Sequence, residues 1–180
     1  GSNIPLSAAG VLILWLGWFG FNGGSVLSAD PANTSLVLVT TCLAAASGGI
    51  GAAFFSNLLY KNLDITMFMN GVLGGLVGIT AGADQMGPTE AIIIGAIGGF
   101  VVVLGVAFLD KCKLDDPVGA IPVHLFAGIW GTLAVGLFGA KGGFDQFMVQ
   151  LASVAIVGVF CVIGALLITL LVKSIIGLRV

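Results

Sequence analysis

The sequence has 180 residues, of which 58% are hydrophobic and 8% are charged, and its mean hydropathy is +1.19. Since a soluble domain carries roughly a quarter charged residues, this composition excludes an ordinary cytosolic enzyme and predicts an all-α integral membrane protein. A formal net charge of −2 provides no basic surface for nucleic acid. One histidine and three scattered cysteines form no hydrolytic, redox or metal-binding motif, so we expect neither an enzyme nor a cofactor.

Six apolar stretches are long enough to cross a bilayer. They cover residues 4–27, 35–59, 65–83, 88–109, 117–138 and 147–176. The polar connectors between them are too short to form domains of their own, so we predict one six-helix unit over residues 1–180. Glycines four residues apart, such as Gly71 and Gly75, are typical of helices that pack closely in lipid.

The basic residues indicate how this unit is oriented in the membrane. With six spans, five of the six fall on the side of the two termini: Lys61, Lys111, Lys113, Lys173 and Arg179. Only Lys141 falls on the other side, which also carries an acidic rim. Because basic residues favour the cytoplasmic side, we expect both termini to be cytoplasmic.

His124 is the only histidine, and it lies within the fifth apolar span. Asp116 followed by Pro117 is typical of a helix start. Eight residues of helix separate Asp116 from His124, or about 12 Å of rise, which predicts that the imidazole lies near the middle of the bilayer. An ionisable group at that depth indicates a functional site; the alternative is a histidine that only makes a helix contact in a structural bundle.

Aromatic residues and a hydroxyl gather at the end of the first span, where Trp18, Phe21 and Ser25 follow one another closely. An aromatic belt at the membrane interface explains the rings without further function. The functional interpretation is a pore mouth. There a ring face attracts a small cation and Ser25 accepts a hydrogen bond from it.

Four segments resemble the ammonium transporter (Amt/Mep/Rh) family in the family's own order. They are WFGFNGGS, NGVLGGLVGITAGAD, DDPVGAIPVHLFAGIWG and IIGLRV. The resemblance covers essentially the whole chain and implies the C-terminal half of a transporter, about transmembrane helices six to eleven of eleven. It implies the second half of an inverted-repeat fold and transport of ammonium or ammonia through a narrow hydrophobic pore.

The resemblance also implies roles for individual residues. Phe21 matches a gate ring at the outer end of the pore, and Ser25, with Trp18 and Thr80 nearby, belongs to an outer site that recruits the substrate. His124 matches the second of two pore histidines. Asp116 matches an aspartate at the start of that helix, for which a helix cap is the simpler explanation.

The family implies partners that this sequence does not contain. The other pore histidine belongs to the N-terminal half, so we expect that half to be supplied by a preceding part of the polypeptide, with a homodimer as the alternative. Homotrimers, a plasma-membrane location and a PII-type regulatory protein are also implied. The alternative function is a non-conducting ammonium sensor module of a membrane signalling protein.

Overall fold

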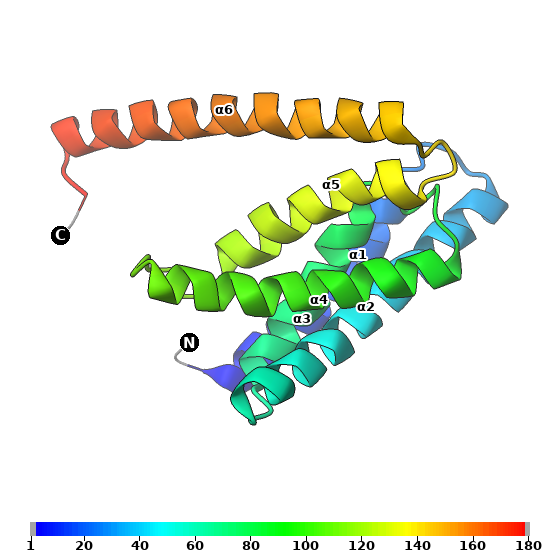
Figure 1. The fold of residues 1–180 in the computed structure, drawn as a ribbon, viewed down its shortest axis with the longest axis horizontal. Coiled ribbons are helices and arrows are strands. Elements are labelled where there is room, and N and C mark those ends of the chain that lie inside the picture. Colours follow the sequence, from blue (N-terminus) through cyan, green and yellow to red (C-terminus); the bar gives the residue numbers. More distant parts are fainter. Residues whose placement is uncertain (1–2, 179–180) are drawn as a thin grey trace.

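The computed structural model describes residues 3–178, and the regular elements in that range are helices joined by loops (Figure 1). The elements are α1 (Ile4–Gly24), α2 (Pro31–Tyr60), α3 (Ile65–Thr80), α4 (Pro88–Lys111), a π-helical segment η1 (Ile121–Phe126), α5 (Ala127–Phe138) and α6 (Phe144–Ile175). Five segments are long and apolar enough to cross a membrane, η1 and α5 counting as one, and α3 is a shorter apolar helix. The prediction of an all-α membrane protein with six helical spans is confirmed.

Side-chain caps decide where the first three helices begin. The Asn3 carboxamide accepts a hydrogen bond from Leu6 N, and Asp30 and Asp64 cap α2 and α3 in the same way. The second helix therefore begins at Pro31, four residues before the predicted start of the second span. An aspartate followed by proline at the first helical position satisfies the free N–H groups of the first turn, although that turn is too polar to count as an apolar span.

Glycines bring the backbones of α2, α3 and α4 into direct contact. A Cβ atom on Gly75 would collide with the carbonyl oxygen of Ala44, and one on Gly95 would meet the same atom from the other side. Gly74 and Gly98 face each other across α3 and α4 in a similar way. The predicted glycine packing is thus present, and these three helices form a rigid core.

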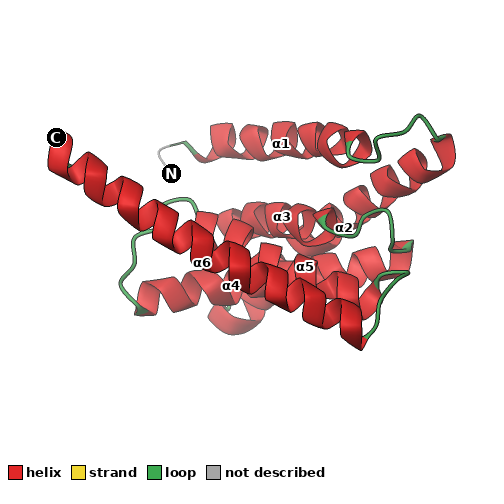
Figure 2. Cartoon of the chain, turned by 90° about the horizontal axis from the view of Figure 1, so that it is seen from above, coloured by secondary structure: helices red, strands yellow, loops and turns green. Residues whose placement is uncertain are grey.

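The helix α3 lies at the centre of the bundle. It contacts α1, α2, α4, η1 and α5, whereas α6 packs against α5 alone and has no buried residue. Figures 1 and 2 show α6 running along one side of the bundle, next to α5. The large apolar side chains of α6, such as Phe160 and Ile168, are therefore exposed in this chain.

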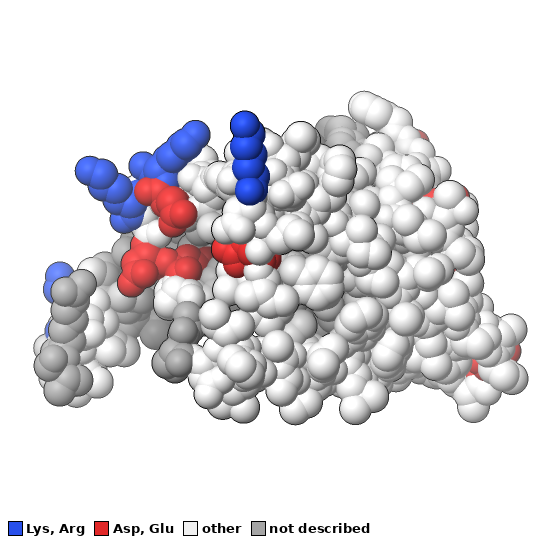
Figure 3. Space-filling view, turned by 90° about the horizontal axis from the view of Figure 1, so that it is seen from below, with Lys and Arg blue, Asp and Glu red and all other residues white. Residues whose placement is uncertain are grey.

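Charged side chains gather at one end of the surface shown in Figure 3, where lysines and acidic residues lie together. A broad uncharged region separates them from a few acidic groups at the opposite end. This distribution is the one expected for a bundle whose middle lies in lipid. Arg179, one of the basic residues counted above, lies outside the described residues.

Candidate functional site: a polar pocket and a histidine cleft

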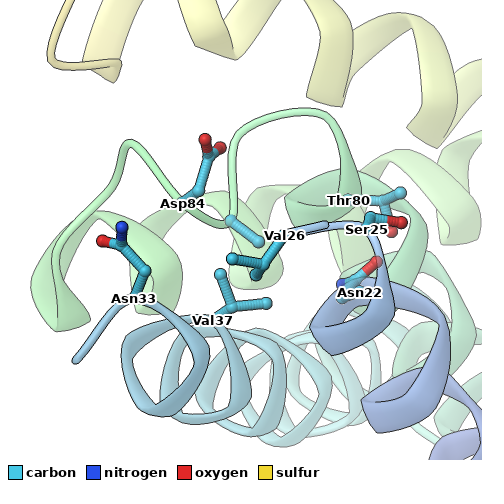
Figure 4. A pocket seen from close by; sticks show the side chains of 8 residues that line it. Asn22, Ser25, Val26, Asn33, Val37, Thr80 and Asp84 are labelled. Carbon is cyan, nitrogen blue, oxygen red and sulfur yellow. The ribbon is translucent and has the colours of Figure 1, made fainter. Parts of the chain in front are cut away.

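A polar pocket of about 390 Å³ opens where α1 ends, α2 begins and the α3–α4 turn passes over them. Its lining residues are Asn22, Ser25, Val26, Asn33, Val37, Thr80, Ala83 and Asp84. Figure 4 shows how these side chains, which come from three separate segments, surround the same space. The pocket contains two of the predicted site residues, Ser25 and Thr80.

The other two predicted residues of this region are joined to the pocket by direct contacts. The indole Nε1 of Trp18 donates a hydrogen bond to Thr80 Oγ1 at 2.8 Å. The Phe21 ring meets the Trp18 ring edge to face, with centroids 5.8 Å apart. Since Phe21 is 60% exposed, its ring is free on the side away from Trp18. The structure therefore brings Trp18, Phe21, Ser25 and Thr80 together.

The hydroxyl groups of the pocket have already used their protons. Ser25 Oγ donates to the carbonyl oxygen of Phe21 at 2.7 Å, and Thr80 Oγ1 donates to that of Leu76 at 2.7 Å. Each hydroxyl has one proton and two lone pairs. Ser25 and Thr80 can therefore only accept further hydrogen bonds, which suits a ligand that carries N–H donors.

Two polar residues of the pocket were not assigned a site role from the sequence. Asn22 lies in the last turn of α1, and Asn33 in the first turn of α2. The sequence did contain one indication of such a role, because Asn22 is a carboxamide at the polar end of an apolar span. The structure also gives Asp84 of the ITAGAD segment a definite position, as the one carboxylate among the described residues that line this pocket.

His124 lies in a different cavity, a cleft of about 340 Å³ between the η1–α5 segment and α6. Its imidazole is exposed in this chain and makes no hydrogen bond to any described residue. The residues that share the cleft are mostly apolar: Leu125, Gly128, Ile129, Thr132, Ser153, Val154, Val157, Gly158 and Cys161. Since a π-helical turn holds one more residue than an α-helical turn, η1 changes the direction in which His124 projects relative to a regular helix.

Asp116 lies before this helix, and the predicted helix start is displaced. Its carboxylate accepts hydrogen bonds from Ala120 N at 2.9 Å and Ile121 N at 2.8 Å. The chain between them makes a turn at Pro117 and passes through Gly119 in the left-handed region, with φ of 73°. The Asp116 carboxylate thus caps a helix that begins four to five residues later, at Ala120 and Ile121. Pro117 lies in the intervening turn and is not the first helical residue.

The electrostatics of Asp116 follow from this geometry. Partial burial raises the pKa of the carboxyl group. Hydrogen bonds from backbone N–H groups outweigh this effect and lower the pKa overall; they come from Ile121, Ala120, Val118 and Gly119. The side chain is therefore a charged cap at neutral pH. Within residues 3–178 no cluster of three or more His, Cys, Asp or Glu residues could hold a metal ion.

Comparison with known proteins decides the family. The model of the Ammonium Transporter Family matches residues 1–180, the full length of the chain. The chain belongs to the Ammonium Transporter Family. The resemblance inferred from the four sequence segments is thereby confirmed.

Individual ammonium transporters match over most of this chain. The ammonium transporter Amt2 of Archaeoglobus fulgidus is 43% identical over 150 residues, which are 83% of this chain and 32% of that protein. A putative ammonium transporter of Synechocystis is 49% identical over 76% of this chain and 32% of its own length. The chain thus spans about a third of these relatives.

Solved structures of the family have the same fold. A protein described as a sensor Amt protein matches with a TM-score of 0.94 and 36% identity, over 99% of this chain and 46% of its own. Mep2 of Saccharomyces cerevisiae matches with a TM-score of 0.91 and 25% identity, over 97% of this chain and 44% of its own. The helices of this ammonium transporter family member correspond to somewhat under half of a complete structure, which agrees with the inferred C-terminal half.

Proposed function

We propose that this chain is part of a transporter that carries ammonium or ammonia across a membrane. The observation that supports it best is the polar pocket beside the Trp18–Phe21 aromatic pair, in which Ser25 and Thr80 offer only acceptors. A small cation with N–H donors satisfies these acceptors and is attracted by an aromatic face.

The proposed path begins at this pocket and continues along the cleft that holds His124. A bare ammonium ion pays on the order of tens of kcal/mol to enter an apolar medium, whereas ammonia pays far less. Ammonium would therefore give one proton to water in the open pocket near Phe21 before ammonia enters the hydrophobic region. Since an imidazole both donates and accepts hydrogen bonds, His124 would guide ammonia, or pass on the separated proton, in a cleft that offers few other polar groups.

The test is ammonium flux in liposomes that contain the full-length protein. The wild-type protein should move ammonium and give an ammonium-dependent current, and His124→Ala should change the flux or its charge coupling. Unchanged flux and current in His124→Ala would remove His124 from the mechanism. A wild-type protein that binds ammonium but moves none would overturn transport itself.

That last outcome would favour the second candidate, an ammonium sensor. One observation supports it: the solved structure described as a sensor Amt protein matches 99% of this chain with a TM-score of 0.94. The two candidates differ in flux and agree in binding. Tryptophan fluorescence titrated with ammonium chloride should report binding in both cases, because Trp18 borders the pocket. The flux measured on the same preparation then separates the two candidates.

We also propose an orientation with the Lys61 and Lys111 end of the bundle in the cytoplasm of the cell, as the basic residues predict. The chain provides its own probe, because Cys112 is exposed and follows α4 directly at that end. A membrane-impermeant maleimide should label Cys112 only after the cells are opened. Labelling of Cys112 in intact cells, in a variant with the other two cysteines replaced, would reverse the orientation.

The proposed assembly follows the family: a homotrimer in the plasma membrane, with the N-terminal half of the transporter covering the His124 cleft, and a PII-type protein as regulator. The exposed apolar side chains of α6 and the open cleft beside it support a covering protein surface. Native mass spectrometry of the full-length protein, alone and with a PII protein, tests the trimer and the regulator separately.

A further inference from the structure

Asn22 is a buried polar residue at the edge of the polar pocket, which is the outer pocket in the proposed orientation. Its side chain is 3% exposed, and its Nδ2 atom donates a hydrogen bond to Thr41 Oγ1 at 3.0 Å. Thr41 itself is completely buried in α2. The carboxamide is therefore held on its nitrogen side by a group that cannot move into solvent.

Holding the nitrogen of a planar amide also decides where its oxygen points. Figure 4 shows the carboxamide oxygen of Asn22 directed toward Ser25 and Thr80, into the space that these residues line. Among the described residues this Oδ1 atom accepts no hydrogen bond, and it is not fully buried, so it keeps contact with the pocket. A polar atom in this position is satisfied by water or by a ligand, which means that the hydrogen-bond partner of Oδ1 comes from the pocket.

The remaining polar groups of the pocket restrict what that partner can be. The protons of Ser25 and Thr80 are used by backbone carbonyl groups, and that of the Asn22 amide nearest the protein is used by Thr41. Asp84 adds a negative charge at the exposed rim. The exposed Asn33 carboxamide and the second N–H of Asn22 add donors to the pocket. The oxygens of Asn22, Ser25 and Thr80 together with the nearby carboxylate still suit a cation with several N–H donors better than an anion.

We propose that Asn22 is a ligand-contacting residue whose carboxamide oxygen accepts a hydrogen bond from ammonium in the outer pocket. This oxygen replaces a water molecule that the ion loses there. Thr41 is the positioning residue that keeps the oxygen turned toward the ion. This inference rests on the proposed function, because it concerns the same substrate. It assigns selectivity to directional acceptors: the N–H groups of ammonium point along fixed directions, whereas K⁺ of similar size has no such preference.

The experiment compares three variants of the full-length protein in liposomes, with ammonium chloride as substrate and potassium chloride as competitor. Asn22→Leu removes the acceptor and should raise the half-saturating ammonium concentration about tenfold, which is the usual effect of losing one hydrogen bond to a charged group. Asn22→Asp keeps an oxygen in place and should stay within about threefold of the wild-type protein. Thr41→Val removes only the hydrogen bond that orients the amide and should give an intermediate increase, with stronger competition from K⁺.

The double variant separates positioning from packing. If Thr41 acts through Asn22, adding Thr41→Val to Asn22→Leu should raise the half-saturating concentration no further than Asn22→Leu alone. The matched control is Ser47→Ala, because Ser47 lies on the same helix and its hydroxyl donates only to Ala44 O of that helix. It should leave the half-saturating concentration unchanged.

Several outcomes would overturn the inference. They are an unchanged half-saturating concentration in Asn22→Leu, additive effects in the double variant, or variants that lower only the melting temperature in detergent. If Asn22→Leu does not fold, an unchanged Thr41→Val with unchanged K⁺ competition is equally decisive. A wild-type protein that moves no ammonium would instead defeat the proposed function, so the two failures are distinguishable.

Discussion

Trp18 Nε1 lies 2.8 Å from Thr80 Oγ1, and this hydrogen bond joins the C-terminal part of α1 to the last residue of α3 across 62 positions of the chain. It fixes the indole ring against which Phe21 packs, and it connects that ring to the wall of the outer pocket. The aromatic pair and the pocket are therefore one unit.

Replacing Thr80 tests this unit. Thr80→Val keeps the shape of the side chain but leaves the indole N–H without an acceptor, so it should destabilise the protein by about 1–2 kcal/mol and lower ammonium affinity. Thr80→Ser retains the hydroxyl and should behave like the wild-type protein in both thermal melting in detergent and ammonium flux. Equal behaviour of the two variants would mean that the hydrogen bond is not important.

The contact between Gly75 and Ala44 predicts a strong effect of a single methyl group. Gly75→Ala would drive a Cβ atom into the Ala44 carbonyl, which is part of a helix that cannot yield locally, and should cost about 1–3 kcal/mol or prevent assembly. Gly164→Ala is the control, because a Cβ atom there has nothing within 4 Å. Melting temperature and size-exclusion profile in detergent give the comparison, and similar profiles for the two variants would contradict the packing described above.

Asp64 predicts a pH dependence of stability. The hydrogen bond from the Thr66 hydroxyl lowers the pKa of this carboxyl group, partial burial raises it, and backbone N–H groups of Thr66 and Met67 lower it further, so the net pKa is below the ordinary 3.8. The stabilisation is therefore complete above the ordinary value and is lost as pH falls through the lowered pKa. It should be absent from Asp64→Ala.

Melting curves of wild type and Asp64→Ala in detergent between about pH 3 and pH 6 measure this effect. The difference should be largest at the upper end, where the cap is worth about 1 kcal/mol, and should shrink toward the lower end. Asp110→Ala is the control, since this carboxylate caps no helix. A difference that is constant over the whole pH range would contradict the assigned role of the charge.

The Asp116 cap predicts an effect on transport through a residue distant from the outer pocket. Asp116→Ala removes the acceptor for Ala120 N and Ile121 N, so the start of η1 should fray and His124 should lose its fixed direction. We expect a lower maximal flux with an unchanged half-saturating concentration. Asp115→Ala, one residue earlier, should leave both unchanged; a change in half-saturation alone in Asp116→Ala would contradict this role.

Much of this architecture could be predicted from the sequence, for identifiable physical reasons. Uninterrupted apolar runs indicate membrane helices, because backbone N–H and C=O groups without hydrogen bonds are too costly in lipid, and a helix pairs them within one segment. The spacing of Gly71 and Gly75 correctly predicted close helix packing, because a side chain at either position would collide with the neighbouring helix. Trp18, Phe21, Ser25 and Thr80 were grouped from motifs of a family. The structure places Ser25 and Thr80 in one pocket and the Trp18–Phe21 pair beside it.

Other features depend on tertiary geometry that no local pattern contains. The turn at Pro117 and the π-helical segment at Ile121 depend on a carboxylate that reaches beyond one helical turn, whereas Asp-Pro by itself predicts a helix that begins at once. The role of Asn22 depends on which side of its amide meets Thr41, a residue 19 positions away. Sequence spacing within α1 carries no information about that contact.

The shortness of α3 has a consequence for the energy of permeation. Its 16 residues rise only about 24 Å, against a hydrocarbon thickness of about 30 Å. The outer pocket lies at the end of this helix, where Thr80 is followed by the turn that carries Ala83 and Asp84. If the chain transports ammonium as proposed, water and ions would reach this pocket within the thickness of the membrane. The low-dielectric barrier that remains would then be thinner than the bilayer, and the substrate would lose its water over a correspondingly shorter path.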